Sequence, residues 1–451
     1  MARRAGAIGR TSIFVTALTL AGCGGYTETV VVPEGPPTAA YGWRESAPRP
    51  DVSGAAAPTG TVTFAEAINH AVAYSPAVKA AYVEIEAKHG DAYQASRRLN
   101  PELAVNIDNL PNSGGVAGEE ASESLQLSQT FELGGKRMAR LNAANLESSI
   151  AVWDYEVARL QAATDAAQLF VDVVASQERI AILRDFVSVS QKTYAAVDAR
   201  VRSGKSSPIE LDRAKVTVAT AKAALASEEA RLAAFRNQLS ALWGSDYATF
   251  ARAGGRLGTK RSAPTLEEVR ASLDANPALA RWGDTIGHRY ALLEVEHSKA
   301  VPNVTIGAGV SRVQSDGSSG MIAGVSLPLP LFDRNEGAIA AAQQRITRAE
   351  YDAQAARTQL TGTLIGALGA LSAADAQARQ LEANVLPAAQ SAFNRTRTGY
   401  EEGKFDLLNV LDTQRTLFEA RRELVNARAE YEKARVQVEA LIGRDLNGLG
   451  K

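Results

Sequence analysis

The chain has 451 residues, with 49 basic and 50 acidic side chains and a formal net charge of −1 at pH 7. This length exceeds one ordinary globular core, so we expect two domains or one long elongated body. The balanced charge excludes a general electrostatic attraction to nucleic acid. Aromatic residues make up 6% of the chain, which is low for a compact enzyme with a wide core. The abundant alanine favours helices packed closely side by side.

The first residues have the pattern of a bacterial export signal, which we assign to residues 1–22. Three arginines precede an apolar stretch, residues 13–20, that is too short to cross a bilayer. Ala21 and Gly22 then precede Cys23, the only cysteine of the chain. A lipoprotein signal peptidase requires small residues before its cysteine, so we predict a covalent lipid on Cys23. The alternative is an ordinary signal peptide with an incidental cysteine.

The residues after Cys23 predict how the chain is anchored. Gly24 stands where an aspartate would favour retention at the inner membrane, so we expect sorting to the outer membrane. Residues 23–60 are rich in Pro, Gly, Thr and Ala without a sustained period, which indicates an extended tether. No later run of about 18 apolar residues exists, so a membrane crossing would have to use strands.

Two spacings occur in both halves of the chain at a shift of about 200 residues. One is an interval of 25 residues between two prolines, and the other is an interval of 40 residues between two glycines. The proline intervals are Pro76 to Pro101 and Pro277 to Pro302, and the glycine intervals are Gly204 to Gly244 and Gly403 to Gly443. We therefore predict two repeats, 61–250 and 263–447, joined by a linker, 251–262.

Each repeat has the pattern of a helix, a pair of strands, a long helix, a glycine break and a second long helix. We expect strands at 102–108, 122–131, 303–314 and 320–329, because apolar side chains alternate with others there. Strands of about 9–11 residues suit a tilted membrane crossing. The alternative is a pair of soluble hairpins that cap the helices.

Four strands per chain leave two open edges. Unpaired N–H and C=O groups at an edge cannot face lipid, and barrels need about eight or more strands to close. If the hairpins lie in a membrane, several chains must share one barrel, and three chains would give twelve strands. This argument requires an oligomer but does not set the number of copies.

The last helix of each repeat has apolar residues at every seventh position, from Leu211 to Leu239 and from Val410 to Val438. A second series, three residues on, consists mostly of alanine and is interrupted at Glu228. This period predicts antiparallel coiled-coil packing. Residues 132–202 are compatible with one helix of about 107 Å, at ~1.5 Å per residue. A cytosolic coiled-coil scaffold would share the heptads but would explain neither the signal nor the hairpins.

After residue 60 the chain resembles the TolC-like family of outer membrane efflux proteins. The resemblance rests on TGYEEGKFDLLNVLDTQRTL (398–417), VRSGKSSPIELDRAKVTVA (201–219), QTFELGGKRMARL (129–141) and LPLPLFDRNEGAIAAA (327–342). The last two stretches are similar to the heavy-metal branch of CzcC type. The resemblance implies a mainly α-helical homotrimer with a twelve-stranded transmembrane β-barrel. It also implies an α-barrel tunnel of long helices, closed at its periplasmic tip.

The resemblance assigns the two glycine breaks to this tip, where the family's helices turn back and a periplasmic adaptor docks. The docking residues would be Gly204, Lys205, Gly403 and Lys404. The physical chemistry agrees, because glycine can adopt the left-handed conformation that ends a helix.

The resemblance also places a ring of acids at the tunnel entrance. The family has two aspartates in a V-D-V-L-D pattern, and the matching residues are Asn409 and Asp412. Three Asp412 carboxylates would attract cations, but the missing acid makes this selectivity weaker or differently placed. Tyr400 and Glu210 match a hydrogen-bonded latch, and Phe405 stands where the family has an arginine. The alternative for Tyr400 is simple packing.

Neither a catalytic site nor a metal site emerges from the sequence, so we expect no enzyme and no cofactor besides the lipid. His288 and His297 are nine residues apart and would face opposite sides of one helix. The stretch Gly134-Gly135-Lys136 lacks the rest of a phosphate-binding loop.

We therefore expect a passive exit duct in the outer membrane of a Gram-negative bacterium, extending into the periplasm. The resemblance implies a periplasmic adaptor and an inner-membrane pump of the resistance-nodulation-division type as partners. Divalent metal ions are the expected substrate, and organic toxicants or drugs are the alternative because the pump makes most of the selection. A lipidated periplasmic adaptor is a further alternative, although it would have one helical hairpin between small β-rich modules.

Overall fold

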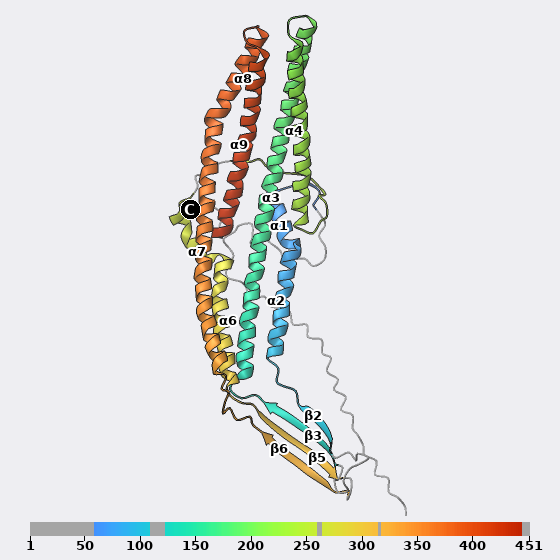
Figure 1. Ribbon diagram of the computed structural model, residues 1–451, viewed down its shortest axis with the longest axis vertical. Helices are drawn as coiled ribbons and strands as arrows, with labels where there is room; N and C mark the ends of the chain where they lie inside the picture. Colours follow the sequence, from blue (N-terminus) through green and yellow to red (C-terminus); the bar gives the residue numbers. More distant parts are fainter. Residues whose placement is uncertain (1–57, 109–121, 259–263, 314–316, 444–451) are drawn as a thin grey trace, which may run out of the picture. The chain divides into compact units, whose positions relative to one another are not determined.

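The computed structural model describes residues 58–108, 122–258, 264–313 and 317–443 (Figure 1). All of them belong to one compact unit, residues 34–451. The predicted signal peptide, Cys23 and most of the predicted tether lie outside the described residues. Among the residues that are described, no helix has both the length and the apolar composition needed to cross a membrane.

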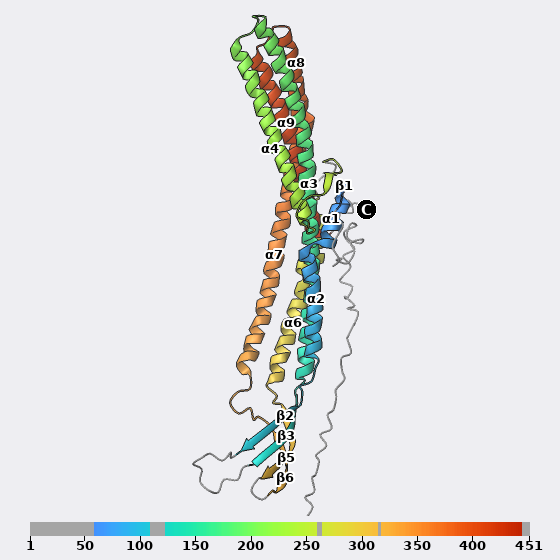
Figure 2. The same ribbon diagram turned by 90° about the vertical axis from the view of Figure 1, so that its right-hand side faces the viewer.

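The described chain is mainly helical, as predicted. Its helices are α1 (Phe64–Tyr74), α2 (Pro76–Ala95), α3 (Lys136–Arg202), α4 (Pro208–Ala241), α5 (Leu266–Arg270), η1 (Ala271–Ala275), α6 (Pro277–Lys299), α7 (Glu336–Gln380), η2 (Leu381–Val385), α8 (Leu386–Glu401) and α9 (Leu407–Ile442). The predicted order of elements occurs twice, and Figure 2 shows α3 with α4 and α8 with α9 as two helical hairpins.

The longest helix, α3, begins several residues after the start of the helix-compatible sequence. Residues from Glu132 were compatible with helix, but Gly134 and Gly135 have φ values of +69° and +73°, outside the right-handed helical region. A Cβ atom on Gly134 would lie 2.7 Å from Cβ of Val301, so the close approach of these two segments requires glycine. The helix therefore starts at Lys136, and its 67 residues extend over about 100 Å.

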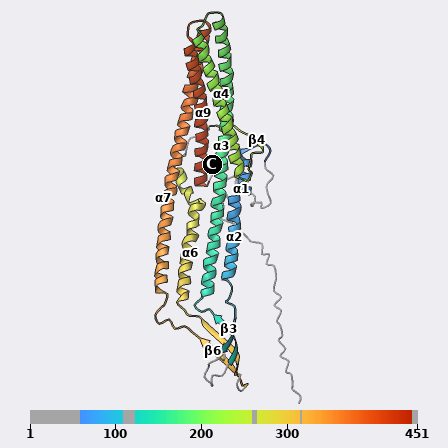
Figure 3. The same cartoon turned by 45° about the vertical axis from the view of Figure 1, so that its right-hand side comes forward.

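Helix α3 holds the two repeats together. It packs against α1, α2 and α4 of the first repeat and against α6 and α9 of the second (Figure 3). Its buried face is rich in alanine, and Ala163, Ala166 and Ala167 are almost fully buried. Small side chains at a contact let helix axes approach closely, as the composition predicted.

A parallel strand pair is a feature that the sequence did not predict. Strands β1 (Gly60–Val62) and β4 (Phe250–Ala253) pair with each other. Gln177 of α3 binds the edge of β4, because its Nε2 donates to the Ala253 carbonyl at 3.0 Å and its Oε1 accepts from the Ala253 amide at 3.2 Å. The start of the predicted linker, 251–262, is therefore a strand attached to the helices.

The other strands form one antiparallel sheet. They are β2 (Glu102–Asp108), β3 (Ser122–Phe131), β5 (Val304–Val313) and β6 (Ser319–Ser326), in the order β2-β3-β5-β6. The bounds of β2 and β3 match the prediction. Strand β6 ends three residues before the predicted Leu329, because Pro328 has no N–H group to donate to a neighbouring strand.

Glu228, which interrupts the alanine series of α4, is buried against α3. Its Oε1 accepts hydrogen bonds from Nε of Arg179 at 2.7 Å and from Oγ of Ser176 at 2.8 Å. Arg179 also donates to Oδ1 of Asn426 on α9 at 3.2 Å. Burial raises the pKa of Glu228, but the hydrogen bonds from Arg179 and Ser176 outweigh it, so the pKa lies below its usual value. This charged group thus joins α3, α4 and α9.

We predict that Glu228→Ala lowers the free energy of unfolding by about 3 kcal/mol, because it leaves the Arg179 guanidinium buried without its partner. The matched control is Glu229→Ala, since Glu229 pairs with Arg184 at the exposed surface and such pairs contribute about 0–1 kcal/mol. Unfolding of the detergent-solubilised protein, followed by helical circular dichroism, measures both. Equal losses for the two variants would contradict the structural role of Glu228.

The same group sets a pH dependence. Because the pKa of Glu228 is depressed in the folded state, its stabilisation is complete above the ordinary glutamate pKa and is lost as the pH falls through the folded value. The stability difference between the unsubstituted chain and Glu228→Gln should therefore shrink below about pH 4.

Candidate functional site

Both helical hairpins end in a tight turn at a glycine with left-handed backbone conformation. The φ angles are +69° at Gly204 and +76° at Gly403. In each turn the next amide bonds back to the helix: Lys205 N donates to the Arg200 carbonyl at 2.8 Å, and Lys404 N donates to the Gly399 carbonyl at 2.7 Å. These bonds satisfy carbonyls that the helix end would leave free, which confirms the predicted helix breaks. Their docking role stays a prediction.

The two return helices begin with caps of different chemistry. Pro208 is the first residue of α4, where its missing N–H costs no hydrogen bond. In α9, Oδ1 of Asp406 accepts from the amide of Asn409 at 3.0 Å and from its side-chain Nδ2 at 2.7 Å. An aspartate at position 409 could not donate this second bond. Asn409, predicted for the entrance ring, therefore takes part in the cap of α9.

Tyr400 is held from α3 rather than from α4. Its ring is almost fully buried, and the Arg200 guanidinium lies 4.7 Å from the ring centroid. Nη1 of Arg200 also donates to the Tyr400 carbonyl at 3.3 Å, and its Nε donates to Oγ of Ser206 at 3.3 Å. Arg200 thus connects the two hairpins near their tips, a role that the sequence analysis did not identify. The only local sign was an arginine four residues before a helix-breaking glycine.

The predicted hydrogen bond between Tyr400 and Glu210 is absent from the single chain. Oη of Tyr400 and Oε2 of Glu210 are both buried, and neither has a hydrogen-bond partner among the described residues. Within the single chain, the Arg200 guanidinium over the ring and the surrounding apolar side chains position Tyr400. A latch role for the two residues stays a prediction.

Phe405, which stands at the family's arginine position, packs its ring on the last turn of α8. A Cβ atom built on Gly399 would lie 2.2 Å from Cδ2 of Phe405, so the ring occupies the space that a side chain at 399 would need. The ring is about half exposed. The tip therefore has an apolar surface where the family pattern has a charge.

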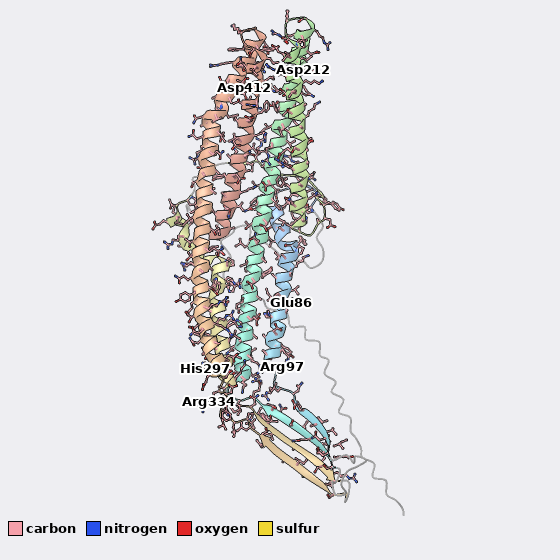
Figure 4. All side chains as sticks on the ribbon, in the orientation of Figure 1. Glu86, Arg97, Asp212, His297, Arg334 and Asp412 are labelled. Carbon is pink, nitrogen blue, oxygen red and sulfur yellow. The ribbon has the colours of Figure 1, made fainter. Side chains whose placement is uncertain are left out.

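Asp412 lies near the tip end of α9 (Figure 4). It belongs to an exposed row of alternating charges. Its carboxylate is 3.8 Å from the guanidinium of Arg415, which is itself 3.6 Å from the carboxylate of Glu419. Arg415 therefore offsets part of the negative field that an entrance ring of Asp412 would produce. The spacing of three residues between Asp412 and Arg415 could have revealed this pair, because such residues are neighbours on a helix.

The same face of α9 borders a groove of about 430 Å³. Its apolar floor includes Leu183 and Phe186 of α3 and Phe418 of α9, and the rings of Phe186 and Phe418 lie 4.5 Å apart. Asp412 and Arg415 line the groove beside these residues. The charged row thus borders an apolar surface between the two hairpins.

The four-stranded sheet has one apolar and one polar face. In the register of the ladder, Leu103 stands opposite Leu127, and Leu127 stands opposite Ala308. The exposed large apolar side chains of this face are Leu103, Val105, Ile107, Leu125, Leu127, Phe131, Ile306, Val310, Met321 and Val325. The other face carries small and polar residues such as Ser124, Gln126, Ser128, Gly307 and Gly309. This alternation is typical of a strand between lipid and a polar interior.

Metal-ligating groups are scattered in the described ranges. No group of three or more His, Cys, Asp or Glu side chains there is placed to hold a metal ion. His288 and His297 both lie on α6, nine residues apart. The arrangement offers exposed tips, a charged helix face and a two-faced sheet.

Comparison with known proteins was made against families, individual sequences and solved structures. The model of the family "Outer membrane efflux protein" matches residues 67–245 and 269–444. The cobalt-zinc-cadmium resistance protein CzcC of Cupriavidus metallidurans is 32% identical over 385 residues, which cover 85% of this chain and 91% of that protein. The nickel-cobalt-cadmium resistance protein NccC of Alcaligenes xylosoxydans xylosoxydans is 28% identical over 70% of this chain and 73% of its own length.

Among solved structures, the outer membrane protein VceC of Vibrio cholerae has a similar fold. The TM-score is 0.70 at 20% sequence identity, and the match covers 84% of this chain and 96% of that chain. At this identity the likeness concerns the fold.

We predict that Arg415→Ala makes a channel of this protein more selective for cations, whereas Asp412→Asn makes it less so. Two unit charges about 4 Å apart interact by about 1 kcal/mol even in water, so each permeability ratio should change by up to about fivefold. Reversal potentials in planar bilayers under a salt gradient measure the ratio. If Asp412→Asn shifts the potential and Arg415→Ala does not, Arg415 does not screen the acid.

Proposed function

We propose that this chain, which belongs to the outer membrane efflux protein family, is the homotrimeric exit duct of a tripartite efflux system. Family membership makes it an outer-membrane efflux protein and not an enzyme. Its work is therefore passive conduction, and the proposal concerns its assembly, its partners and its substrate.

The main support for the trimer is that the sheet has two open edges and one apolar face. Strands β2 and β6 each have a single neighbour within the described chain. In lipid, each unpaired N–H or C=O group would cost several kcal/mol, so strands from other copies must complete the ladder. Three copies of this sheet would supply twelve strands, enough to close a barrel.

The helices supply the periplasmic part of the proposed duct. The 67 residues of α3 extend over about 100 Å, a length that would span a large part of the periplasm. We place the adaptor at the exposed turns around Gly204, Lys205, Gly403 and Lys404, and an inner-membrane pump of the resistance-nodulation-division type beyond it. Glycine turns suit such docking because their backbone is accessible without a side chain in the way.

Divalent metal cations are the proposed substrate. The relative CzcC is named for resistance to cobalt, zinc and cadmium, and NccC for resistance to nickel, cobalt and cadmium. The charged row of α9 gives the proposed entrance a mixed rather than a strongly acidic surface, so the duct itself would select cations weakly. The pump would then make most of the selection.

Deletion of this gene should raise the sensitivity of its host to zinc, cobalt or cadmium, and the unsubstituted chain should restore growth. Two adjacent substitutions on β3 test the duct itself. Leu125→Arg puts a charge on the apolar face, which costs about 2–4 kcal/mol at the centre of a bilayer, and should abolish restoration. Gln126→Arg lies on the polar face and should be tolerated. If the deletion strain keeps its tolerance to these metals but loses tolerance to organic toxicants, organic compounds are the substrate instead.

Cys23 is the proposed anchor, with acyl chains that hold the chain at the outer membrane. Each buried methylene contributes about 0.8 kcal/mol, so two or three chains anchor firmly. Cells grown with labelled palmitate should label the chain, and Cys23→Ala should lose the label. A label retained by Cys23→Ala would place the lipid elsewhere.

A further inference from the structure

A short apolar segment follows β6 at the open edge of the sheet. We define residues Leu327–Asp333 as the collar segment. Leu329 and Leu331 are 69% and 68% exposed, and Phe332 is fully exposed. Every residue from Leu327 to Asp333 is exposed in the single chain. A contiguous apolar surface of this kind marks an interaction site.

The sequence of the collar segment prevents it from continuing the sheet. Pro328 and Pro330 have no N–H group, so β6 ends at Ser326 and the next residues leave the ladder. The amide of Leu331 bonds locally to the Leu329 carbonyl at 2.9 Å. The segment is therefore a bent apolar strap rather than an edge strand, and its contacts must come from side chains.

The opposite edge of the same sheet has a complementary surface. We define residues Tyr93–Leu103, from the last turn of α2 to the start of β2, as the acceptor patch. Tyr93, Leu99 and Leu103 are 47%, 44% and 65% exposed. Arg97 and Arg98 are also exposed, and the Arg97 guanidinium lies over the Tyr93 ring at 3.7 Å. The patch thus combines apolar side chains with two arginines and one acid, Glu102, which leaves it with a net positive charge.

Strand direction determines which surfaces meet when copies join. Strand β2 runs away from α2 and β6 runs toward α7, so these two edge strands are antiparallel. When β6 of one copy pairs with β2 of the next, the end of β6 lies beside the start of β2. Figure 4 shows Arg97 at the foot of α2, from which the chain enters β2, and Arg334 at the foot of α7, which follows β6.

We propose that the collar segment of one copy packs on the acceptor patch of the next copy. The leucines and Phe332 would cover Leu99 and Tyr93, and Asp333 would approach Arg97 and Arg98. The contact continues the seam between copies from the sheet to the ends of the helices. This inference rests on the proposed trimer and names the second copy, rather than lipid, as the occupant.

Two observations favour a second copy over lipid. The collar segment is continuous with an edge strand that needs a partner chain, so the neighbour is already beside it. The charges are also compatible, because Asp333 ends the collar segment and the two arginines of the acceptor patch outnumber its one acid, Glu102. Opposite charges across an interface favour the correct partner and orientation.

Cysteine cross-linking in the full chain tests the contact. The double variant Leu329→Cys with Leu99→Cys, oxidised in isolated outer membranes, should give covalent dimers and trimers on non-reducing gels. Each single variant should stay monomeric, which also controls for Cys23. The matched control is Leu329→Cys with Tyr351→Cys, because Tyr351 lies on α7 outside both surfaces and is more exposed than Leu99, yet this pair should not cross-link.

A second pair separates the collar contact from the trimer itself. Val325→Cys with Leu103→Cys joins the two edge strands, and it should cross-link if copies share one barrel. Links at this pair without links at 329 and 99 would overturn the collar contact and leave the trimer standing. Links at neither pair, in protein that reaches the outer membrane, would overturn both.

Tryptophan fluorescence tests lipid as the occupant. In reconstituted trimers, Phe332→Trp should be quenched weakly by brominated lipids, because the ring lies against protein. The comparison is Met321→Trp on the apolar face, which should be quenched strongly. Equal quenching at the two positions would assign the collar segment to lipid and contradict the contact.

Discussion

An antiparallel sheet of four strands leaves one row of backbone N–H and C=O groups without partners on each outer strand. Here the outer strands are β2 and β6, and one face of the sheet carries large apolar side chains. Water can satisfy an open edge, but lipid cannot, so an apolar face and open edges are incompatible in one isolated chain. The proposed trimer removes this conflict. The collar contact follows from the same geometry, since it lies where one copy's β6 would meet the next copy's β2.

The helices meet a different requirement, which is to keep two long hairpins aligned over a great length. Helix α3 contacts both repeats, and its alanine-rich face lets the neighbouring helices approach closely. Helices packed through apolar seams alone could shift along one another by seven residues and still bury the same faces. The buried Glu228, with Arg179 and Asn426, places a directional contact between three helices, and polar groups of this kind select one register.

The tips depart from the family pattern in ways that fit together. Asn409 bonds to Asp406 in the cap of α9, and Phe405 covers Gly399. Arg415 stands beside Asp412, the acid that remains. Asn409 and Phe405 are uncharged where the family pattern has charged residues, and Arg415 offsets the charge of Asp412. The proposed entrance is therefore less acidic and more apolar than the family pattern implies, which is consistent with selection by a pump rather than by the duct.

The sequence by itself determined the duplication, the glycine breaks and the strands β2 and β3, because periodicity and backbone preference act over a few residues. Pro328 also indicated that β6 ends early, but the apolar alternation continues past it and led to a longer predicted strand. Tertiary structure decided the rest: the partners of Glu228, the stacking of Arg200 on Tyr400, and the pairing of β1 with β4. Those contacts join residues far apart in the chain. Their geometry depends on how the long helices pack against one another, and no local spacing encodes it.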